Sequence, residues 1–193
     1  MLKIDMHTHI MPKHLPRWAE KFGYDGFIHL DHHKDGWARM MQGDKFFREI
    51  NENCWNPEVR INEYLEFKTH VQVVCTIPVL FAYFAKPEDG LEVAKFLNDD
   101  LADLVHKYPK NYIGLGTIPM QDVDLSVQEL HRIKQIGLQG IQIGSNIDNK
   151  NLNEPEFFPI WEACEQLDLA VMVHPWNMMG KKYMDRYWLP WLV

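Results

Sequence analysis

The sequence predicts an α/β protein built on a parallel sheet, because short apolar segments bounded by turn residues alternate with stretches of helical periodicity. Five segments have the length and composition of strands: residues 2–6, 71–77, 112–117, 140–143 and 169–173. The second and the fifth are nearly continuous apolar runs, so we expect both of their faces to be covered.

Three helices are expected between these strands. Residues 86–108 and 122–136 place apolar side chains on one stripe of a helix, and Gly137 is suited to the position just past the second helix. Asn153 and Glu156 resemble a capping box that would open a third helix. The side chains that this third helix would present are Phe157, Phe158, Trp161, Cys164 and Leu167.

Residues 11–50 do not follow the alternation and are predicted to be an insertion after the first strand, of the kind that forms lids, binding loops or small subdomains. We expect residues 1–193 to form a single incomplete domain. The end of the chain, residues 187–193, is apolar to the last residue. Because five βα units cannot close an eight-stranded barrel, two sheet edges are expected to stay open.

Composition limits the classes of function. A formal net charge of -7 and the absence of a basic block argue against nucleic acid as a partner, whereas a small anionic substrate is compatible with a local positive site. No apolar run has the length of a membrane span, and no signal peptide is visible, so we expect a cytoplasmic protein without a membrane partner. Cys54, Cys75 and Cys164 are expected to be free thiols.

Three histidines are the candidate metal ligands. His7 and His9 follow the first apolar segment two residues apart, so that both side chains point to one side of the strand. His174 directly follows the fifth segment. The carboxyl ends of parallel strands are where barrel active sites are built, and neutral imidazoles suit Zn best, with Mn, Co or Fe as alternatives.

Other polar residues allow two interpretations each. Asp5 faces the same side as His7 and either supports a metal ligand or hydrogen-bonds to backbone. His29, His32 and His33 are expected to lie in a solvated loop rather than to bind metal. Arg48 either binds a substrate carboxylate, with Phe46 and Phe47 excluding water around it, or pairs with Glu49 or Asp44.

Four segments resemble one family closely: residues 4–9, 52–61 and 86–89, and His174-Pro175-Trp176. The family is that of the 2-amino-3-carboxymuconate-6-semialdehyde decarboxylases, within the amidohydrolase superfamily, and the similarity extends over all 193 residues. It implies a (β/α)8 TIM barrel of the amidohydrolase type, here truncated after about five βα units.

The resemblance also implies what the site residues do. His7, His9 and His174 would bind Zn, Arg48 would hold a substrate carboxylate, and Trp191 would lie near the active site. The expected reaction is non-oxidative, metal-dependent decarboxylation by a homodimer, in tryptophan (kynurenine) catabolism or in bacterial 2-nitrobenzoate-type degradation.

Catalytic residues are expected outside this chain. The family uses a catalytic histidine from the sixth strand and a metal-bound aspartate from the eighth, both beyond Val193, so the isolated chain is expected to be inactive. Asn177 departs from the family, which usually has Asp after His-Pro-Trp. The alternatives are a related aromatic-acid decarboxylase or hydrolase of the same superfamily and a non-catalytic fragment.

Overall fold

The structure of the protein is a computed structural model that describes residues 2–180 and 183. At its centre is a parallel sheet with the strand order β1-β5-β6-β7-β10. Its strands are β1 (Ile4–His9), β5 (Val71–Cys75), β6 (Tyr112–Gly116), β7 (Gly140–Gly144) and β10 (Ala170–His174). All five predicted strands are therefore confirmed, with small changes at their ends.

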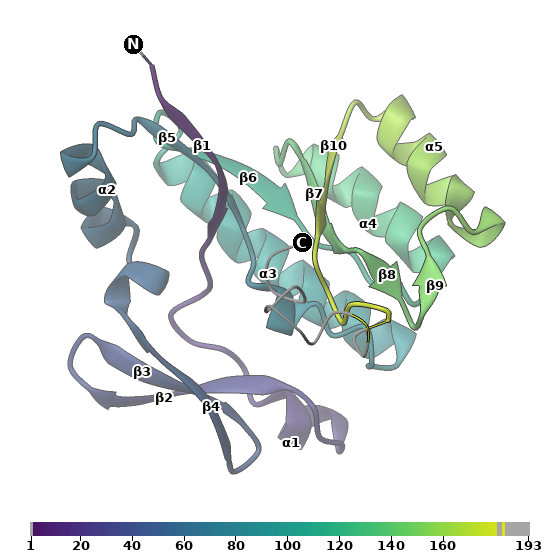
Figure 1. Cartoon of the computed structure of the whole chain (residues 1–193), viewed down its shortest axis with the longest axis horizontal. Coiled ribbons are helices and arrows are strands. Elements are labelled where there is room, and N and C mark those ends of the chain that lie inside the picture. Colours follow the sequence, from purple (N-terminus) through teal and green to yellow (C-terminus); the bar gives the residue numbers. More distant parts are fainter. Residues whose placement is uncertain (1, 181–182, 184–193) are drawn as a thin grey trace.

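Helices α3 (Pro87–Lys107) and α4 (Val123–Gln135) cover one face of the sheet, and α5 (Phe158–Gln166) packs beside α4 (Figure 1). The largest core cluster lies between these helices and the strands. It includes the buried side chains Val74, Leu101, Tyr112, Leu130, Ile133, Ile141 and Ile143. Because Ile141 and Ile143 face the helices, the residues that alternate with them, Gln142 and Gly144, face the other side of the sheet.

The first two predicted helices are confirmed, and Gly137 lies just past the second one as predicted. The side chain of Asp122 accepts a hydrogen bond from the backbone N–H of Leu125 at 2.9 Å and so caps the start of α4. Gly137, at φ 87°, occupies the left-handed conformation just past the end of α4.

The predicted capping box at Asn153 is wrong. A short 3-10 helix, η3 (Pro155–Phe157), precedes α5, and Phe157 occupies the capping position of α5 without a side-chain hydrogen bond. A 3-10 helix has three residues per turn rather than 3.6. The side chains from Phe157 onward therefore point in other directions than they would in one continuous α-helix. Phe157 is buried as expected, but Phe158 points to solvent.

Helix α2 (Pro57–Glu66) was not predicted, although its start carries a recognisable signal. The Asn56 side chain accepts hydrogen bonds from the backbone N–H groups of Glu58 and Val59, and Pro57 takes the first helical position. The short 3-10 helix η1 (Glu52–Cys54) leads into it. The remaining short elements are η2 (Pro78–Leu80), β8 (Asn146–Ile147) and β9 (Lys150–Asn151).

Most of the predicted insertion forms a short helix and a three-stranded antiparallel sheet. These are α1 (Trp18–Phe22), β2 (Ile28–Lys34), β3 (Trp37–Gln42) and β4 (Lys45–Asn51), with the strand order β2-β3-β4. Figure 1 places this sheet beside the carboxyl ends of the central strands. Three buried side chains of the insertion, Trp18, Phe27 and Met40, share a second core cluster with Val93 and Leu97 of α3. This cluster anchors the insertion to the rest of the fold.

Both edges of the described central sheet are open, as predicted, because β1 and β10 each have one neighbour in it. The expectation that residues 169–173 are covered on both faces is wrong, since Val171 and Val173 are 39% and 50% exposed. A continuous apolar segment does not reveal whether its strand lies at the edge of the sheet or inside it. Within the described residues, no helix combines the length and apolar character needed to cross a bilayer.

Candidate metal centre

The three predicted histidines meet at the carboxyl edge of the sheet. β1 continues through His9, so His7 and His9 lie near the carboxyl end of this strand. His174 is the last residue of β10, at the opposite edge of the sheet. Each of the three offers a ring nitrogen within 4.8 Å of the others. The ring centroids are 4.9 to 5.2 Å apart. Among the described residues, this is the one group of three or more His, Cys, Asp or Glu side chains whose ligand atoms are close enough to share a metal ion.

Two backbone carbonyls set which ring nitrogens are free. Nδ1 of His9 lies 3.0 Å from the carbonyl oxygen of Thr76, and Nδ1 of His174 lies 2.8 Å from that of Pro175. A carbonyl only accepts, so both Nδ1 atoms carry the proton and leave Nε2 with a lone pair. Such a carbonyl partner is what commonly orients a metal-binding histidine. The sequence did not indicate Thr76, since its role depends on the β1–β5 pairing.

The spacing of His7 and His9 suits a tetrahedral ion. Their Nε2 atoms are 3.2 Å apart, and two ligands bound tetrahedrally at about 2.0–2.1 Å lie roughly 3.3 Å from each other. Burial, and then the neighbouring His7 and His174, lower the pKa of His9 to about 4 despite the bond to Thr76. Burial likewise lowers the pKa of His174. Both rings are therefore neutral at pH 7, which is the form that binds a metal.

The residues around the cluster differ in their contribution. Oδ1 of Asp5 accepts a hydrogen bond from the backbone N–H of His7 at 3.4 Å. Of the two interpretations of Asp5, the structure therefore favours the hydrogen bond to backbone over the support of a metal-binding imidazole. The thiol of Cys75 lies 3.5 Å from Nδ1 of His9, but burial raises its pKa to about 12. Cys75 therefore stays protonated. All three cysteines are free, as predicted.

Arg48 lies on β4 and pairs in register with Met40 of β3, so the two side chains share one face of the small sheet. That face is the one that packs toward the rest of the protein, since Met40 is fully buried. Among the described residues Arg48 forms no ion pair, so the predicted alternative of a bond to Glu49 or Asp44 is not observed. Its guanidinium stays available for an anion.

The expectation that Phe46 and Phe47 exclude water around Arg48 is wrong. Phe46 is 61% exposed and Phe47 is 46% exposed. An irregularity in the β3–β4 pairing at this point sets Met40 opposite Arg48 and Met41 opposite Phe46, which leaves Phe47 unpaired. Phe47 does contact Arg48, with the guanidinium carbon 5.9 Å from the ring centre.

His29, His32 and His33 lie on strand β2 and not in the predicted loop. Nε2 of His32 lies 2.6 Å from the carbonyl oxygen of Lys13, and Nε2 of His33 lies 3.1 Å from a carboxylate oxygen of Glu49. These contacts give His32 and His33 structural partners. Among the described residues these histidines do not belong to a group with metal-binding spacing.

Trp176 and Asn177 come shortly after His174 and are held by the β7–β8 segment. Asn146 donates hydrogen bonds from Nδ2 to the carbonyl oxygens of Trp176 (2.6 Å) and Asn177 (3.3 Å). Asn177 has φ 38°, a left-handed conformation that asparagine tolerates well. The predicted site residue Trp191 lies outside the described residues.

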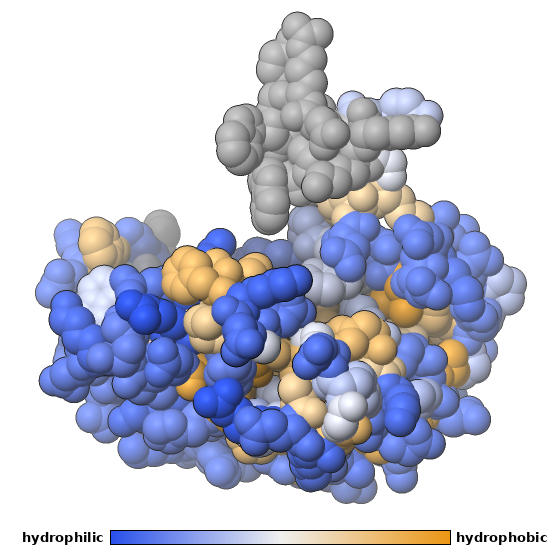
Figure 2. All heavy atoms as spheres, turned by 90° about the horizontal axis from the view of Figure 1, so that it is seen from below, coloured by the Kyte–Doolittle hydropathy of each residue, from blue (hydrophilic) through white to orange (hydrophobic). Residues whose placement is uncertain are grey.

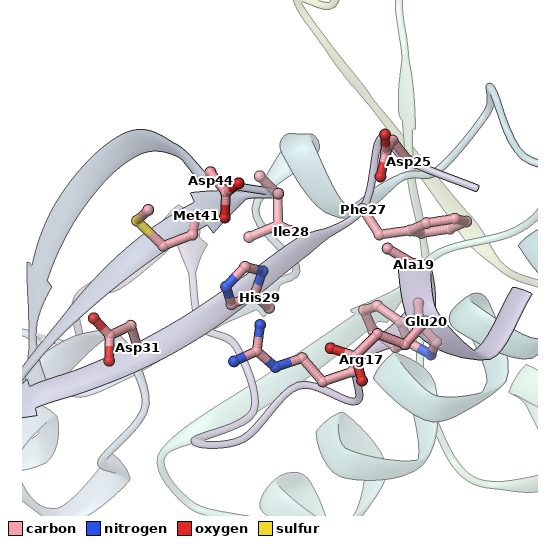
Figure 3. A pocket seen from close by; sticks show the side chains of 12 residues that line it. Arg17, Ala19, Glu20, Asp25, Phe27, Ile28, His29, Asp31, Met41 and Asp44 are labelled. Carbon is pink, nitrogen blue, oxygen red and sulfur yellow. The ribbon is translucent and has the colours of Figure 1, made fainter. Parts of the chain in front are cut away.

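Two larger hollows lie away from the histidines. One of about 610 Å³ is bordered by Tyr83, Gln121, Trp176 and Asn177. The other, of about 520 Å³, lies between α1 and the small sheet, where the Arg17 guanidinium points toward His29 (Figure 3). Viewed from the side of the carboxyl ends, the surface is mostly hydrophilic with separate apolar patches (Figure 2). Neither hollow is lined by the three histidines.

A parallel βα sheet with imidazoles gathered at its carboxyl edge is characteristic of (β/α)-barrel enzymes. Residues 4–185 match the amidohydrolase family, so the chain belongs to that family. Its five parallel strands correspond to part of the (β/α)8 barrel of these proteins. The truncated amidohydrolase-type barrel predicted from the sequence is confirmed as a fold class.

Curated relatives give a finer comparison. The chain is 55% identical over 193 residues to 2-amino-3-carboxymuconate-6-semialdehyde decarboxylase of Dictyostelium discoideum, covering 100% of this chain and 54% of the relative. It is 34% identical over 241 residues to the enzyme of the same name from Caenorhabditis elegans, covering 99% and 60%. The chain thus spans little more than half the length of these relatives.

Among solved structures, one similar fold is 5-carboxyvanillate decarboxylase from Novosphingobium aromaticivorans, determined with bound manganese and a nitrobenzoic acid. The TM-score is 0.61 and the identity 30%, over 64% of this chain and 36% of that one. The chain is therefore similar both to muconate semialdehyde decarboxylases and to a decarboxylase of aromatic acids.

Proposed function

We propose that this chain supplies the first half of a metal-dependent decarboxylase acting on 2-amino-3-carboxymuconate 6-semialdehyde in tryptophan (kynurenine) catabolism. The observation that carries the proposal is the convergence of His7, His9 and His174 from opposite edges of the sheet, with two of the three rings oriented by carbonyls. The 55% identity to the Dictyostelium decarboxylase supports the substrate.

The three histidines would hold the metal through their Nε2 atoms. We favour zinc because all three ligands are imidazoles and the spacing of His7 and His9 suits a tetrahedral ion, and manganese is the alternative that the Novosphingobium structure supports. When bound, the ion supplies electrostatic stabilisation of developing negative charge and activation of water. The rings of His9 and His174 are held in place and neutral, with Nε2 free of a proton, so metal binding requires no rearrangement of either ring.

Arg48 would bind a carboxylate of the substrate. Arg48 has no ion-pair partner within the described residues, and it is exposed on the face of the small sheet that it shares with the buried Met40. A planar guanidinium binds a carboxylate through two parallel hydrogen bonds, which fixes the orientation of the substrate as well as its position. The negatively charged protein surface makes such a local cation necessary for an anionic substrate.

The proposal can be tested with a chimera in which residues 1–193 are followed by the remaining part of the Dictyostelium relative. We expect the zinc-loaded chimera to remove the chromophore of the muconate semialdehyde with release of one CO2, and the His174→Ala variant to lose both zinc and activity. A zinc-loaded, folded chimera that leaves this substrate unchanged would refute the proposed substrate.

A second candidate is decarboxylation of aromatic acids, which the similarity to the 5-carboxyvanillate enzyme favours. The same chimera offered 5-carboxyvanillate and 2,6-dihydroxybenzoate separates the two, since the proposed function predicts turnover of the muconate substrate alone. The isolated chain assayed beside the chimera tests whether 193 residues suffice. We expect the chain alone to bind metal without turnover, because three ligands at an open sheet edge leave the site incomplete.

We further infer that the complete enzyme is a cytoplasmic homodimer. The three free thiols are typical of a reducing compartment. Light scattering of the chimera and localisation of a tagged protein in cells test the two inferences.

A further inference from the structure

Arg60, on the first turns of α2, makes two hydrogen bonds that join separate parts of the fold. Its Nε donates to Oε1 of Gln72 at 2.8 Å, and its NH1 donates to the carbonyl oxygen of Asn53 at 3.0 Å. Gln72 is a buried residue of β5, whereas Asn53 belongs to η1, the turn that follows the small sheet. The guanidinium therefore bridges the central sheet and the exit of the insertion.

Each end of this bridge leads to the candidate site. On the sheet side, β5 runs from Gln72 to the Thr76 carbonyl that orients His9. On the other side, the backbone N–H of Met11, two residues after His9, donates to the carbonyl oxygen of Cys54 at 3.0 Å. The η1 turn is thus held against the end of β1 as well as against β5.

The η1 turn also leads back to Arg48. Strand β4 ends at Asn51, so three residues separate Arg48 from the start of η1. Burial raises the pKa of the Cys54 thiol, and the positive charges of Arg60 and Arg48 both oppose that effect. The bond from Arg60 to Asn53 therefore holds the turn into which the strand of Arg48 leads.

We propose that Arg60 is a positioning residue that sets the place of Arg48 relative to the three histidines. The inference rests on the proposed function, in which Arg48 binds the substrate carboxylate. Arg60 itself contacts neither the histidines nor an anion; it acts through η1. A guanidinium is required because its rigid fork presents two donors at a fixed angle, and a lysine could keep only one of the two bonds.

Alkylation of Cys54 in the full 193-residue chain tests the bridge directly. The rate at Cys54 is measured by mass spectrometry with iodoacetamide, a neutral reagent, in wild type, Arg60→Gln and Arg60→Lys. We expect Arg60→Gln to raise the rate by at least about fivefold, because η1 loses an anchor and opens more often. Arg60→Lys should give an intermediate rate.

The direction of this change excludes a simple charge effect. Removing a nearby positive charge raises the thiol pKa and would slow the reaction of the thiolate, whereas release of η1 speeds it. Arg39→Gln, on β3, is the matched control and should react like wild type. A wild-type rate in Arg60→Gln would overturn the proposal. If Cys75 and Cys164 were also alkylated in Arg60→Gln, that variant would have unfolded. The alkylation rate at Cys54 in Arg60→Lys, compared with wild type, would then decide.

Calorimetric titration of the zinc-loaded chain with cis,cis-muconate, a six-carbon unsaturated dicarboxylate, tests the action through Arg48. We expect Arg48→Gln to weaken muconate binding at least about tenfold and Arg60→Gln to weaken it severalfold. Changing both residues should weaken binding by less than about twofold beyond Arg48→Gln alone. Additive losses would overturn the proposal. If wild type bound zinc but not muconate, the proposed substrate class would fail, while the Cys54 rates would still decide the role of Arg60.

Discussion

Nδ1 of His9 lies 3.0 Å from the carbonyl oxygen of Thr76, across the first pair of strands in the sheet. This contact fixes the tautomer of His9 and turns its Nε2 toward Nε2 of His7, 3.2 Å away. The backbone of β5 thereby prepares an imidazole of β1 for a metal. The relationship depends on the β1–β5 register, in which His9 stands opposite Cys75.

Zinc should stabilise the folded chain through this cluster. At a zinc concentration about 100 times the dissociation constant, mass action adds about 2.7 kcal/mol to the free energy of unfolding, so the melting temperature should rise on addition of zinc and fall again with a chelator. His9→Ala should abolish the rise, which differential scanning fluorimetry detects. The control is His131→Ala, an exposed residue of α4. An unchanged response in His9→Ala would remove this residue from the metal site.

Arg48→Lys in the chimera should lower kcat/KM by more than roughly tenfold, because a point charge cannot replace a bidentate contact with a carboxylate. Steady-state kinetics with the muconate semialdehyde measure this change, and the melting temperature should stay close to that of the parent because Arg48 is exposed. Near-normal kinetics would show that Arg48 does not bind substrate.

Glu129 holds helices α3 and α4 together and should be essential for stability. It is fully buried, accepts a hydrogen bond from Nδ2 of Asn98 at 2.6 Å, and pairs with Arg132 at 2.8 Å. Glu129→Ala leaves Arg132 without its buried partner and should lower the free energy of unfolding by about 3–5 kcal/mol. Chemical denaturation measures this loss.

The surface pair of Lys150 and Glu156 is the matched control for Glu129, since both of its side chains are about half exposed. Glu156→Ala should cost less than about 1 kcal/mol. Equal losses at Glu129 and Glu156 would contradict the role assigned to the buried network.

Gly140 permits the close approach of β7 and β10. A Cβ at this position would lie 2.2 Å from the carbonyl oxygen of Ala170, an atom of the backbone that cannot move by itself. Gly140→Ala should therefore push β10 away, destabilise the chain by about 1–3 kcal/mol and weaken zinc binding through displacement of His174.

Gly43→Ala separates this steric effect from backbone strain, because Gly43 has φ 56° and open space around it. It should lose about 1 kcal/mol of stability but keep wild-type zinc affinity, measured by competition with a chromogenic chelator. Zinc affinity that is unchanged in Gly140→Ala would show that β10 tolerates the displacement.

The thiols should differ strongly in reactivity. Cys75 is fully buried and burial raises its pKa to about 12, so at pH 8 almost none of it is thiolate. Cys164 is buried too, with its pKa raised to about 11. Native protein should therefore react at Cys54 first, and mass spectrometry should find the other two labelled only after denaturation. Early labelling of Cys75 would contradict the packing between β1 and β5.

Much of this protein follows from patterns within single segments. The five strands, helices α3 and α4, Gly137 just past α4, and the placement of His7 and His9 on one side of β1 all depend on periodicity and on residues close in sequence. Because local chemistry determines them, the sequence alone predicted them.

Other features depend on which distant segments meet, and only the tertiary structure decided them. The exposure of Val173 follows from the place of β10 at a sheet edge, and the orientation of His9 follows from a carbonyl 67 residues away. The strand at His29 to His33 and the exposure of Phe46 follow from pairing within the small sheet. Long-range pairing has no signature in a single segment, because its free energy arises from contacts between two of them.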